Sequence, residues 1–265
     1  MRPTISINTL CLAPDRLEAQ LGLVAALGAS AISLEIEQVS LIGAKRAAAV
    51  IQDAGLSAAL LTHRAFGFAT PVKATQQRDR LKRSIDVAHT IGASAICLTS
   101  GPRESLLWPE ALKRFAAEIH PCAEYAQSAG VALGLEPTSH LYADVSIAHR
   151  LSDVVTLART AGINVGIDLF ACWADSDIET AIVDAGPMTA FVQISDYVLG
   201  DRALPCRAVP GDGDIPLDHL LQLILGTGFC GPIDIEIIGP RLEAEGRATG
   251  LKRAISYLRE KMAGN

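Results

Sequence analysis

The sequence lacks any apolar run that approaches the length of a membrane span. Its N-terminal segment, MRPTISINTLCLAPD, has only a short apolar stretch before a polar turn, so no secretory signal peptide is predicted. No CxxC pair occurs among the 6 cysteines, which are expected to be free thiols in a reducing compartment. Together these absences predict a soluble, cytoplasmic protein without a membrane partner.

Basic charge is also scarce. The 23 Lys and Arg residues are outnumbered by 29 Asp and Glu residues, the formal net charge is -6, and no basic face is evident. A nucleic-acid partner is therefore not expected. Hydrophobic residues make up 49% of the chain, which is enough for a large core. The expected partner is a small molecule that binds in a pocket.

Short apolar segments rich in β-forming residues recur eight times along the chain. Each is nearly continuous in apolar residues, as expected of a strand that is buried on both faces. The predicted strands cover residues 5–12, 31–37, 57–63, 95–101, 131–138, 165–171, 191–197 and 233–238.

Amphipathic segments alternate with these strands, and many end at a glycine, as in TAGINVGIDLF. The predicted helices cover residues 15–27, 42–54, 75–91, 108–129, 146–160, 177–185, 217–225 and 248–262. Eight such units without a linker predict one (β/α)8 TIM barrel domain of the α/β class over residues 1–265, since this fold typically needs ~250 residues. An open doubly wound sheet is the alternative, but the GxGxxG and P-loop motifs typical of such sheets are absent.

Polar residues occur late in four successive predicted strands. They are Glu136, Asp168, Gln193 and Glu236. Because the carboxyl ends of barrel strands form the active site, these side chains are predicted to converge there. Carboxylates of like charge repel one another unless a positive group lies among them. One divalent metal ion bound by all four residues is the simplest solution; the alternative is that each acid is satisfied separately by Lys, Arg or a backbone N–H.

The predicted ligands offer only oxygen atoms, from three carboxylates and one amide. Such a set favours a hard cation, Mn²⁺ or Mg²⁺, over Zn²⁺, which prefers nitrogen and sulfur donors. Zn²⁺ and Co²⁺ are the alternatives.

The eight units, the strand motifs LEPT, GIDLF, VQISDY and DIEII, and the segment RAVPGDGDIP resemble the sugar phosphate isomerase/epimerase group of xylose isomerase-like TIM barrels. The resemblance covers the whole chain and is closest in pattern to inosose isomerases, ketose 3-epimerases and hydroxypyruvate isomerases. It implies metal ligation by Glu136, Asp168 and Glu236, with Glu136 and Glu236 as the catalytic acid/base pair. Many barrels of this group form homodimers or homotetramers, but no surface in the sequence identifies such an interface.

Two positions depart from the family pattern. The ligand on the seventh strand is usually His, but here it is Gln193, and the motif Asp-x-x-His on the sixth strand here ends in Ala171. A glutamine on the seventh strand is similar to the 3-dehydroshikimate dehydratases of the same superfamily, although those usually keep the histidine on the sixth. The departures leave the type of reaction open.

The resemblance implies an isomerase or epimerase of a sugar, keto-polyol or inosose that acts through a metal-stabilised enediolate. A metal-dependent dehydratase or lyase of a β-hydroxy ketone is the alternative, because expulsion of a β-hydroxyl follows the same early steps. A hydrolase similar to endonuclease IV and a metal-free binding protein are further alternatives. The sequence does not identify the substrate or its stereochemistry.

Four further residues are predicted to contact the substrate. The resemblance implies that Arg207, which precedes the turn PGDGD, faces it, and that Glu35 near the end of the second strand points into the mouth. His63 at the end of the third strand and His140 after Glu136 are also predicted at the mouth, where each could donate a hydrogen bond. The alternative for both histidines is an ordinary hydrogen-bonded loop side chain.

Overall fold

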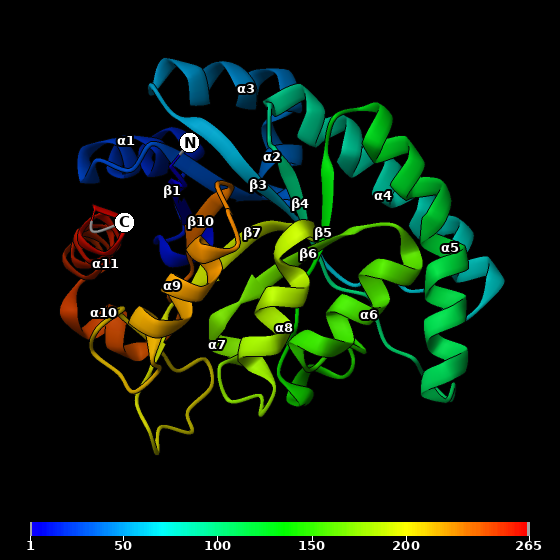
Figure 1. Ribbon diagram of the computed structural model, residues 1–265. Helices are drawn as coiled ribbons and strands as arrows, with labels where there is room; N and C mark the ends of the chain where they lie inside the picture. Colours follow the sequence, from blue (N-terminus) through cyan, green and yellow to red (C-terminus); the bar gives the residue numbers. More distant parts are fainter. Residues whose placement is uncertain (1, 264–265) are drawn as a thin grey trace.

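Eight strands pair in parallel around a closed barrel in the computed structural model, which describes residues 2–263 (Figure 1). Their order around the barrel is β1-β10-β7-β6-β5-β4-β3-β2. The strands are β1 (Thr4–Asn8), β2 (Ala31–Glu35), β3 (Ser57–His63), β4 (Ala95–Leu98), β5 (Ala132–Leu135), β6 (Asn164–Asp168), β7 (Thr189–Ile194) and β10 (Pro232–Ile235). The predicted (β/α)8 barrel is confirmed.

Helices follow the strands and form an outer ring. The ring consists of α1 (Leu17–Leu27), α3 (Ala44–Asp53), α4 (Pro71–Ile91), α5 (Trp108–Ser128), α6 (Leu151–Ala161), α8 (Ile178–Ala185), α9 (Leu217–Gly226) and α11 (Arg247–Ala263). Shorter elements lie between them: α2 (Ile36–Ile42), α7 (Leu169–Cys172), α10 (Pro240–Glu245), the 3-10 turns η1 (Thr9–Cys11), η2 (His140–Tyr142) and η3 (Gly186–Met188), and an antiparallel pair, β8 (Asp196–Tyr197) with β9 (Arg207–Ala208).

Several predicted boundaries were wrong. The helix predicted over residues 42–54 begins two residues later, at Ala44 of α3, because Gly43 with φ +82° separates it from α2, a helix that was not predicted. Seven of the eight predicted strands end two to four residues early, among them the strands that end at Glu35, Leu98 and Asp168. Helices α2 and α7 begin directly after two of these strands.

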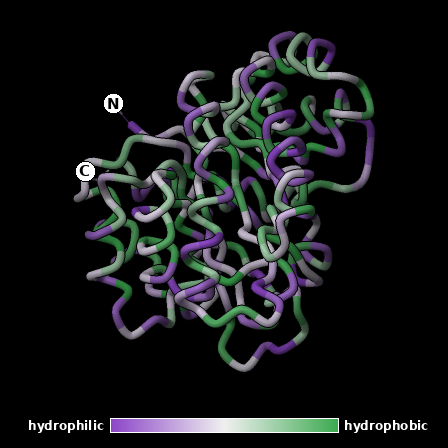
Figure 2. The backbone as a smooth tube through the Cα atoms, turned by 90° about the vertical axis from the view of Figure 1, so that its right-hand side faces the viewer, coloured by the Kyte–Doolittle hydropathy of each residue, from purple (hydrophilic) through white to green (hydrophobic). Residues whose placement is uncertain are grey.

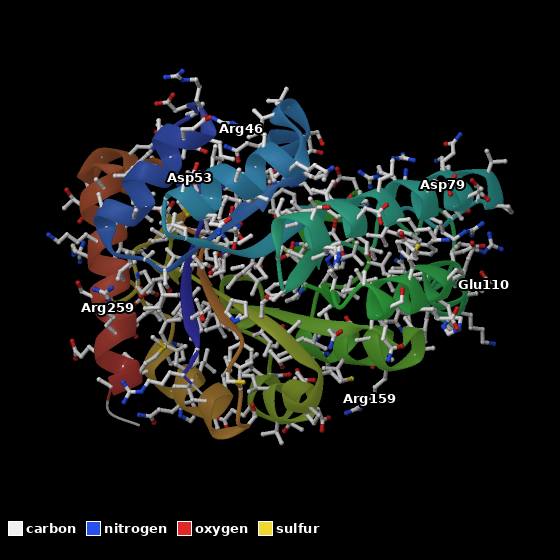
Figure 3. The ribbon with its side chains drawn as sticks, turned by 90° about the horizontal axis from the view of Figure 1, so that it is seen from above. Arg46, Asp53, Asp79, Glu110, Arg159 and Arg259 are labelled. Atoms are coloured by element: carbon white, nitrogen blue, oxygen red, sulfur yellow. The ribbon has the colours of Figure 1, made fainter. Side chains whose placement is uncertain are left out.

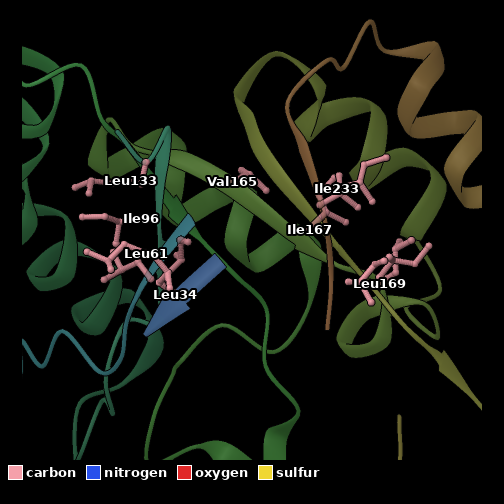
Figure 4. Close-up of a cluster of buried hydrophobic side chains, with 14 of the residues drawn as sticks. Leu34, Leu61, Ile96, Leu133, Val165, Ile167, Leu169 and Ile233 are labelled. Carbon is pink, nitrogen blue, oxygen red and sulfur yellow. The ribbon is translucent and has the colours of Figure 1, made fainter. Parts of the chain in front are cut away.

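The outer core lies between the strands and the ring of helices. Leu34, Leu61, Ile96, Leu133 and Ile233 belong to it and are at most 2% exposed (Figure 4). Charged side chains project from the solvent faces of the helices, as Arg46 and Asp53 do on α3 (Figure 3). Hydrophobic and hydrophilic stretches accordingly alternate along the backbone (Figure 2). No helix within residues 2–263 is both long enough and apolar enough to span a membrane.

Phe191 of β7 fills the interior of the barrel and is 0% exposed. Gly134 and Gly166 on the two preceding strands leave the room for its ring. A Cβ atom at either glycine would lie 2.4 or 2.2 Å from a ring carbon. These three residues therefore close the barrel across β5, β6 and β7.

Candidate active site

A cavity of about 220 Å³ opens at the carboxyl ends of the strands. Its lining includes all four residues predicted to converge: Glu136, Asp168, Gln193 and Glu236. Arg207 lines the same cavity. Its volume is below the usual range for drug-sized ligands, so it suits a small molecule.

Strand pairing brings the four residues together. Asp168 at the end of β6 is level with Gln193 on β7. Glu136 and Glu236 directly follow β5 and β10, and each donates its backbone N–H, at 3.1 Å, to a carbonyl of a neighbouring strand. Because these hydrogen bonds extend the ladders by one residue, the backbone of both glutamates is held rigidly. Asp168, Gln193 and Glu236 are at most 9% exposed.

Arg207 lies among the acids and forms a bidentate ion pair with Asp168. Its two terminal nitrogens are 3.1 and 2.6 Å from the two carboxylate oxygens of Asp168. Its Nη2 is also 3.6 Å from Oε1 of Glu236, and its guanidinium lies over the ring of Phe170 at 4.5 Å. Asp168 is therefore compensated by an arginine, as in the alternative considered from the sequence.

Asp196 fixes the loop that carries Arg207. Its carboxylate accepts backbone N–H groups of Tyr197, Gly211, Gly213 and Ile215 at 2.8 to 3.1 Å. The PGDGD turn is thereby anchored to the end of the barrel. Asp196 thus positions the antiparallel pair β8 and β9, which carries Arg207.

Glu136 and Glu236 both have raised pKa values. Burial, and then the charges of Glu236 and Asp168, raise the pKa of Glu136 to about 8, although the thiol of Cys97 and the charge of Arg207 act in the opposite direction. Burial raises the pKa of Glu236 to about 7 against the lowering effect of Arg207. Groups that titrate near neutral pH can both donate and accept a proton, which is the requirement for an acid/base pair.

A further buried acid, Asp234 on β10, lies two residues before Glu236. It accepts hydrogen bonds from Ser6, Ser33 and Asn8 at 2.5 to 3.0 Å. Burial raises its pKa to about 6. Since three side chains donate to its carboxylate and it does not line the cavity, Asp234 is a structural residue beneath the cavity floor.

Gln193 supplies an oxygen that suits a hard cation. Its Nε2 donates to Oε2 of Glu236, and its Oε1 is buried without a hydrogen-bond partner. An unpaired buried oxygen beside three carboxylates fits a cation such as Mn²⁺ or Mg²⁺ by the kind of donor atoms. Within residues 2–263, however, no three His, Cys, Asp or Glu side chains are grouped as a metal site, and Asp168 is paired with Arg207 instead.

The other three residues predicted to contact substrate lie outside the cavity lining. His63 is 0% exposed, and its Nδ1 is 2.9 Å from Ser84 Oγ on α4. The alternation of side chains along β3 explains this position, since the preceding Thr62 lines the cavity. His140 is exposed in η2. Glu35 lines a separate groove.

Sequence reasoning missed most of the other residues that line the cavity, and two of them carry reactive or charged side chains. Cys97 on β4 donates its S–H to Glu136 Oε2 at 3.1 Å, and Arg64 follows β3. The period of two along each strand is the signal that could have found them. Thr62 and Arg64 form one such pair, and Cys97 and Thr99 form another.

Comparisons with known proteins agree with this architecture. The sequence model of the family described as xylose isomerase-like TIM barrel matches residues 21–261. The chain is 27% identical over 192 residues to a 3-dehydroshikimate dehydratase of Pseudomonas putida, covering 69% of this chain and 30% of that protein. It is 24% identical over 163 residues to a fructoselysine 3-epimerase of Shigella flexneri, covering 60% of this chain and 58% of that protein.

The alignments thus span less than two thirds of the length of both relatives. A solved structure of an IolI protein with a bound zinc atom has the same fold, with a TM-score of 0.84, 16% identity and 98% coverage of both chains. The cavity lies where enzymes of this architecture carry their active sites. From the match over residues 21–261, the chain belongs to the xylose isomerase-like TIM barrel family.

Proposed function

We propose that this protein is a divalent-metal-dependent isomerase or epimerase of a small hydroxylated ketone, such as a sugar, a keto-polyol or an inosose. The observation that carries the proposal is the convergence of Glu136 and Glu236 in one cavity, together with Asp168, Gln193 and Arg207. Membership of the family and the likeness to a 3-epimerase support it.

The ligands that we propose for the metal are Glu136, Asp168, Gln193 and Glu236. The unpaired Oε1 of Gln193 supports this set. A solved structure of the same fold contains a bound zinc atom, which supports the presence of a metal but not particular ligands. Mn²⁺ or Mg²⁺ is the proposed ion because all four donors are oxygens. When bound, such an ion polarises the substrate carbonyl and acidifies the neighbouring C–H.

The two glutamates divide the proton transfer between them. One carboxylate removes the proton α to the carbonyl, which gives an enediolate, and a carboxylic acid returns a proton. Return to the neighbouring carbon gives an isomer, and return to the opposite face of the same carbon gives an epimer. Arg207, held in place by Asp168, lies in the same cavity, and its positive charge stabilises the oxygen on which negative charge develops.

A dehydratase or lyase is the second candidate. Gln193 favours it, since glutamine replaces the histidine usual in the isomerases, and so does the likeness to a 3-dehydroshikimate dehydratase. In this reaction one of the two glutamates, Glu136 or Glu236, removes the α proton, and the other protonates the departing β-hydroxyl.

A cytoplasmic location and a homodimeric or homotetrameric assembly remain predictions.

Solvent-deuterium exchange tests the proposal. The protein with Mn²⁺ in D₂O is expected to incorporate deuterium into at least one member of a panel of ketoses, inososes and small hydroxylated keto acids such as hydroxypyruvate. Glu136→Gln and Glu236→Gln should each reduce the exchange rate by about 100-fold or more. Glu110→Gln, an exposed carboxylate on α5, should leave it unchanged.

Two results would count against isomerisation. Absence of exchange with every member of the panel contradicts it. A new aromatic absorbance with 3-dehydroshikimate, without exchange into the ketoses, supports the dehydratase instead, because loss of water from this cyclic enone gives an aromatic ring.

A further inference from the structure

Two arginines line the cavity in the part of the chain that the structure describes, and they differ in how their donors are used. Arg207 is committed to Asp168 and Ser195. Arg64 makes one side-chain contact, from Nη2 to Oε1 of Glu35 at 3.4 Å, and its side chain is 57% exposed. Most of the N–H groups of Arg64 therefore remain available to a ligand.

The backbone that carries Arg64 is tightly held. Arg80 on α4 donates to the carbonyl oxygens of both Arg64 and Ala65. The N–H of Ala65 donates to Thr99 Oγ1 at 2.7 Å, which ties the loop to the end of β4. Ala65 itself has φ +51°, in the left-handed region that residues with a Cβ rarely adopt. A strained conformation that is held in place by its surroundings is typical of functional sites.

The pair with Glu35 does not account for this arrangement. It is a single long contact between partly exposed side chains, a type of ion pair that contributes little to stability. Glu35 lies outside the cavity lining, whereas Arg64 belongs to it, so the pair does not satisfy a charge within the cavity. Burial lowers the pKa of Arg64, but the carboxylates of Glu35, Glu236 and Glu136 raise it overall, so the side chain stays charged.

We propose that Arg64 binds a carboxylate group of the substrate at the cavity mouth, so that the substrate is a small hydroxylated keto acid rather than a neutral sugar. The inference rests on the proposed function. A guanidinium with free N–H groups binds a carboxylate through two parallel hydrogen bonds. The uncharged lining residues Asn8, Thr62, Thr99 and Thr138 suit the hydroxyl groups of such a molecule.

A matched pair of ligands tests the proposal. Hydroxypyruvate and 1,3-dihydroxyacetone differ only in a carboxylate against a hydroxymethyl group. Isothermal titration of the protein, with and without Mn²⁺, is expected to show tighter binding of hydroxypyruvate. In Arg64→Met its Kd should rise by about 10- to 100-fold, and the Kd of dihydroxyacetone should stay within about twofold. Arg202→Met removes an exposed arginine and should match the wild-type protein.

Two outcomes overturn the inference: no preference for hydroxypyruvate in the wild-type protein, or the same preference in Arg64→Met. If Arg64→Met does not fold, Glu35→Gln replaces it, because loss of the Glu35 charge frees the guanidinium and should tighten hydroxypyruvate binding by about twofold or more. Unchanged binding in Glu35→Gln would likewise overturn it.

Deuterium exchange separates the two proposals. Exchange into neutral ketoses without a carboxylate preference retains the proposed function and rejects the role of Arg64. A preference for the carboxylate ligand that depends on Arg64, without exchange into any ligand, retains the role of Arg64 and rejects the proposed function.

Discussion

Arg207 Nη2 lies 2.6 Å from Oδ2 of Asp168, and the two side chains form a buried bidentate ion pair at the centre of the site. Each charge compensates the other, so removal of one partner leaves the other unpaired in a poorly hydrated cavity. Because Asp168 is also a proposed metal ligand, binding of a metal ion by its carboxylate would compete with this ion pair.

Arg207→Met is expected to lower the free energy of unfolding by about 3–5 kcal/mol, because it leaves the Asp168 carboxylate buried and unpaired. Urea unfolding at neutral pH measures the change. The double variant Arg207→Met with Asp168→Leu should recover most of the loss, since it buries no unpaired charge. If the double variant is instead less stable than Arg207→Met alone, the two side chains do not stabilise each other and the prediction is wrong.

Mn²⁺ is expected to raise the melting temperature of the wild-type protein if the four proposed residues bind it. At a concentration 100-fold above Kd, binding stabilises the native state by about 2.7 kcal/mol. Gln193→Leu should weaken this effect because it removes the unpaired amide oxygen, whereas Glu110→Gln should not. A melting temperature unmoved by Mn²⁺, Mg²⁺, Zn²⁺ and Co²⁺ would reject the metal site.

His63 is expected to make stability depend on pH on the acid side of neutrality. Burial, and then the charge of Arg80, lower its pKa to about 3, against about 6.5 in the unfolded chain. Between these values the unfolded state binds the extra proton, so stability is lost as the pH falls below about 6.5, by at most about 1.4 kcal/mol per pH unit.

The comparison of wild type with His63→Gln isolates this effect from the carboxylates, whose raised pKa values act in the opposite sense. The advantage of the wild type in unfolding free energy at pH 7.5 should shrink steadily towards pH 4. A constant difference for His63→Gln would contradict the prediction.

Gly166→Ala is expected to destabilise the fold by about 1–3 kcal/mol or more, because its Cβ would overlap the ring of Phe191. Phe191→Leu in the same chain should restore part of the loss by making room. Gly22→Ala, on α1 with no neighbouring atom within 4 Å, should instead stabilise by about 0.5–1 kcal/mol. Thermal unfolding of the three variants checks both signs, and a neutral Gly166→Ala would show that the ring has space to move.

The barrel and the convergence of four polar residues could be predicted because both follow from local patterns. Continuous apolar runs mark buried parallel strands, and strand ends meet at one face. The ion pair of Arg207 with Asp168 could not be predicted in this way, because it joins residues 39 positions apart through a hairpin. No local pattern encodes that distance.

The direction of individual side chains was the other limit. His63 and Thr62 are adjacent, and which of them faces the cavity depends on the register of β3 against its neighbours. A shift of one residue exchanges the two faces of a strand. For the same reason Arg64 was overlooked although it follows His63 directly.

The ring of Phe191, enclosed by Gly134 and Gly166, has a kinetic consequence. Because it closes the barrel, a product leaves by the mouth through which its substrate entered. A molecule that occupies the mouth therefore blocks both the entry and the exit of any other.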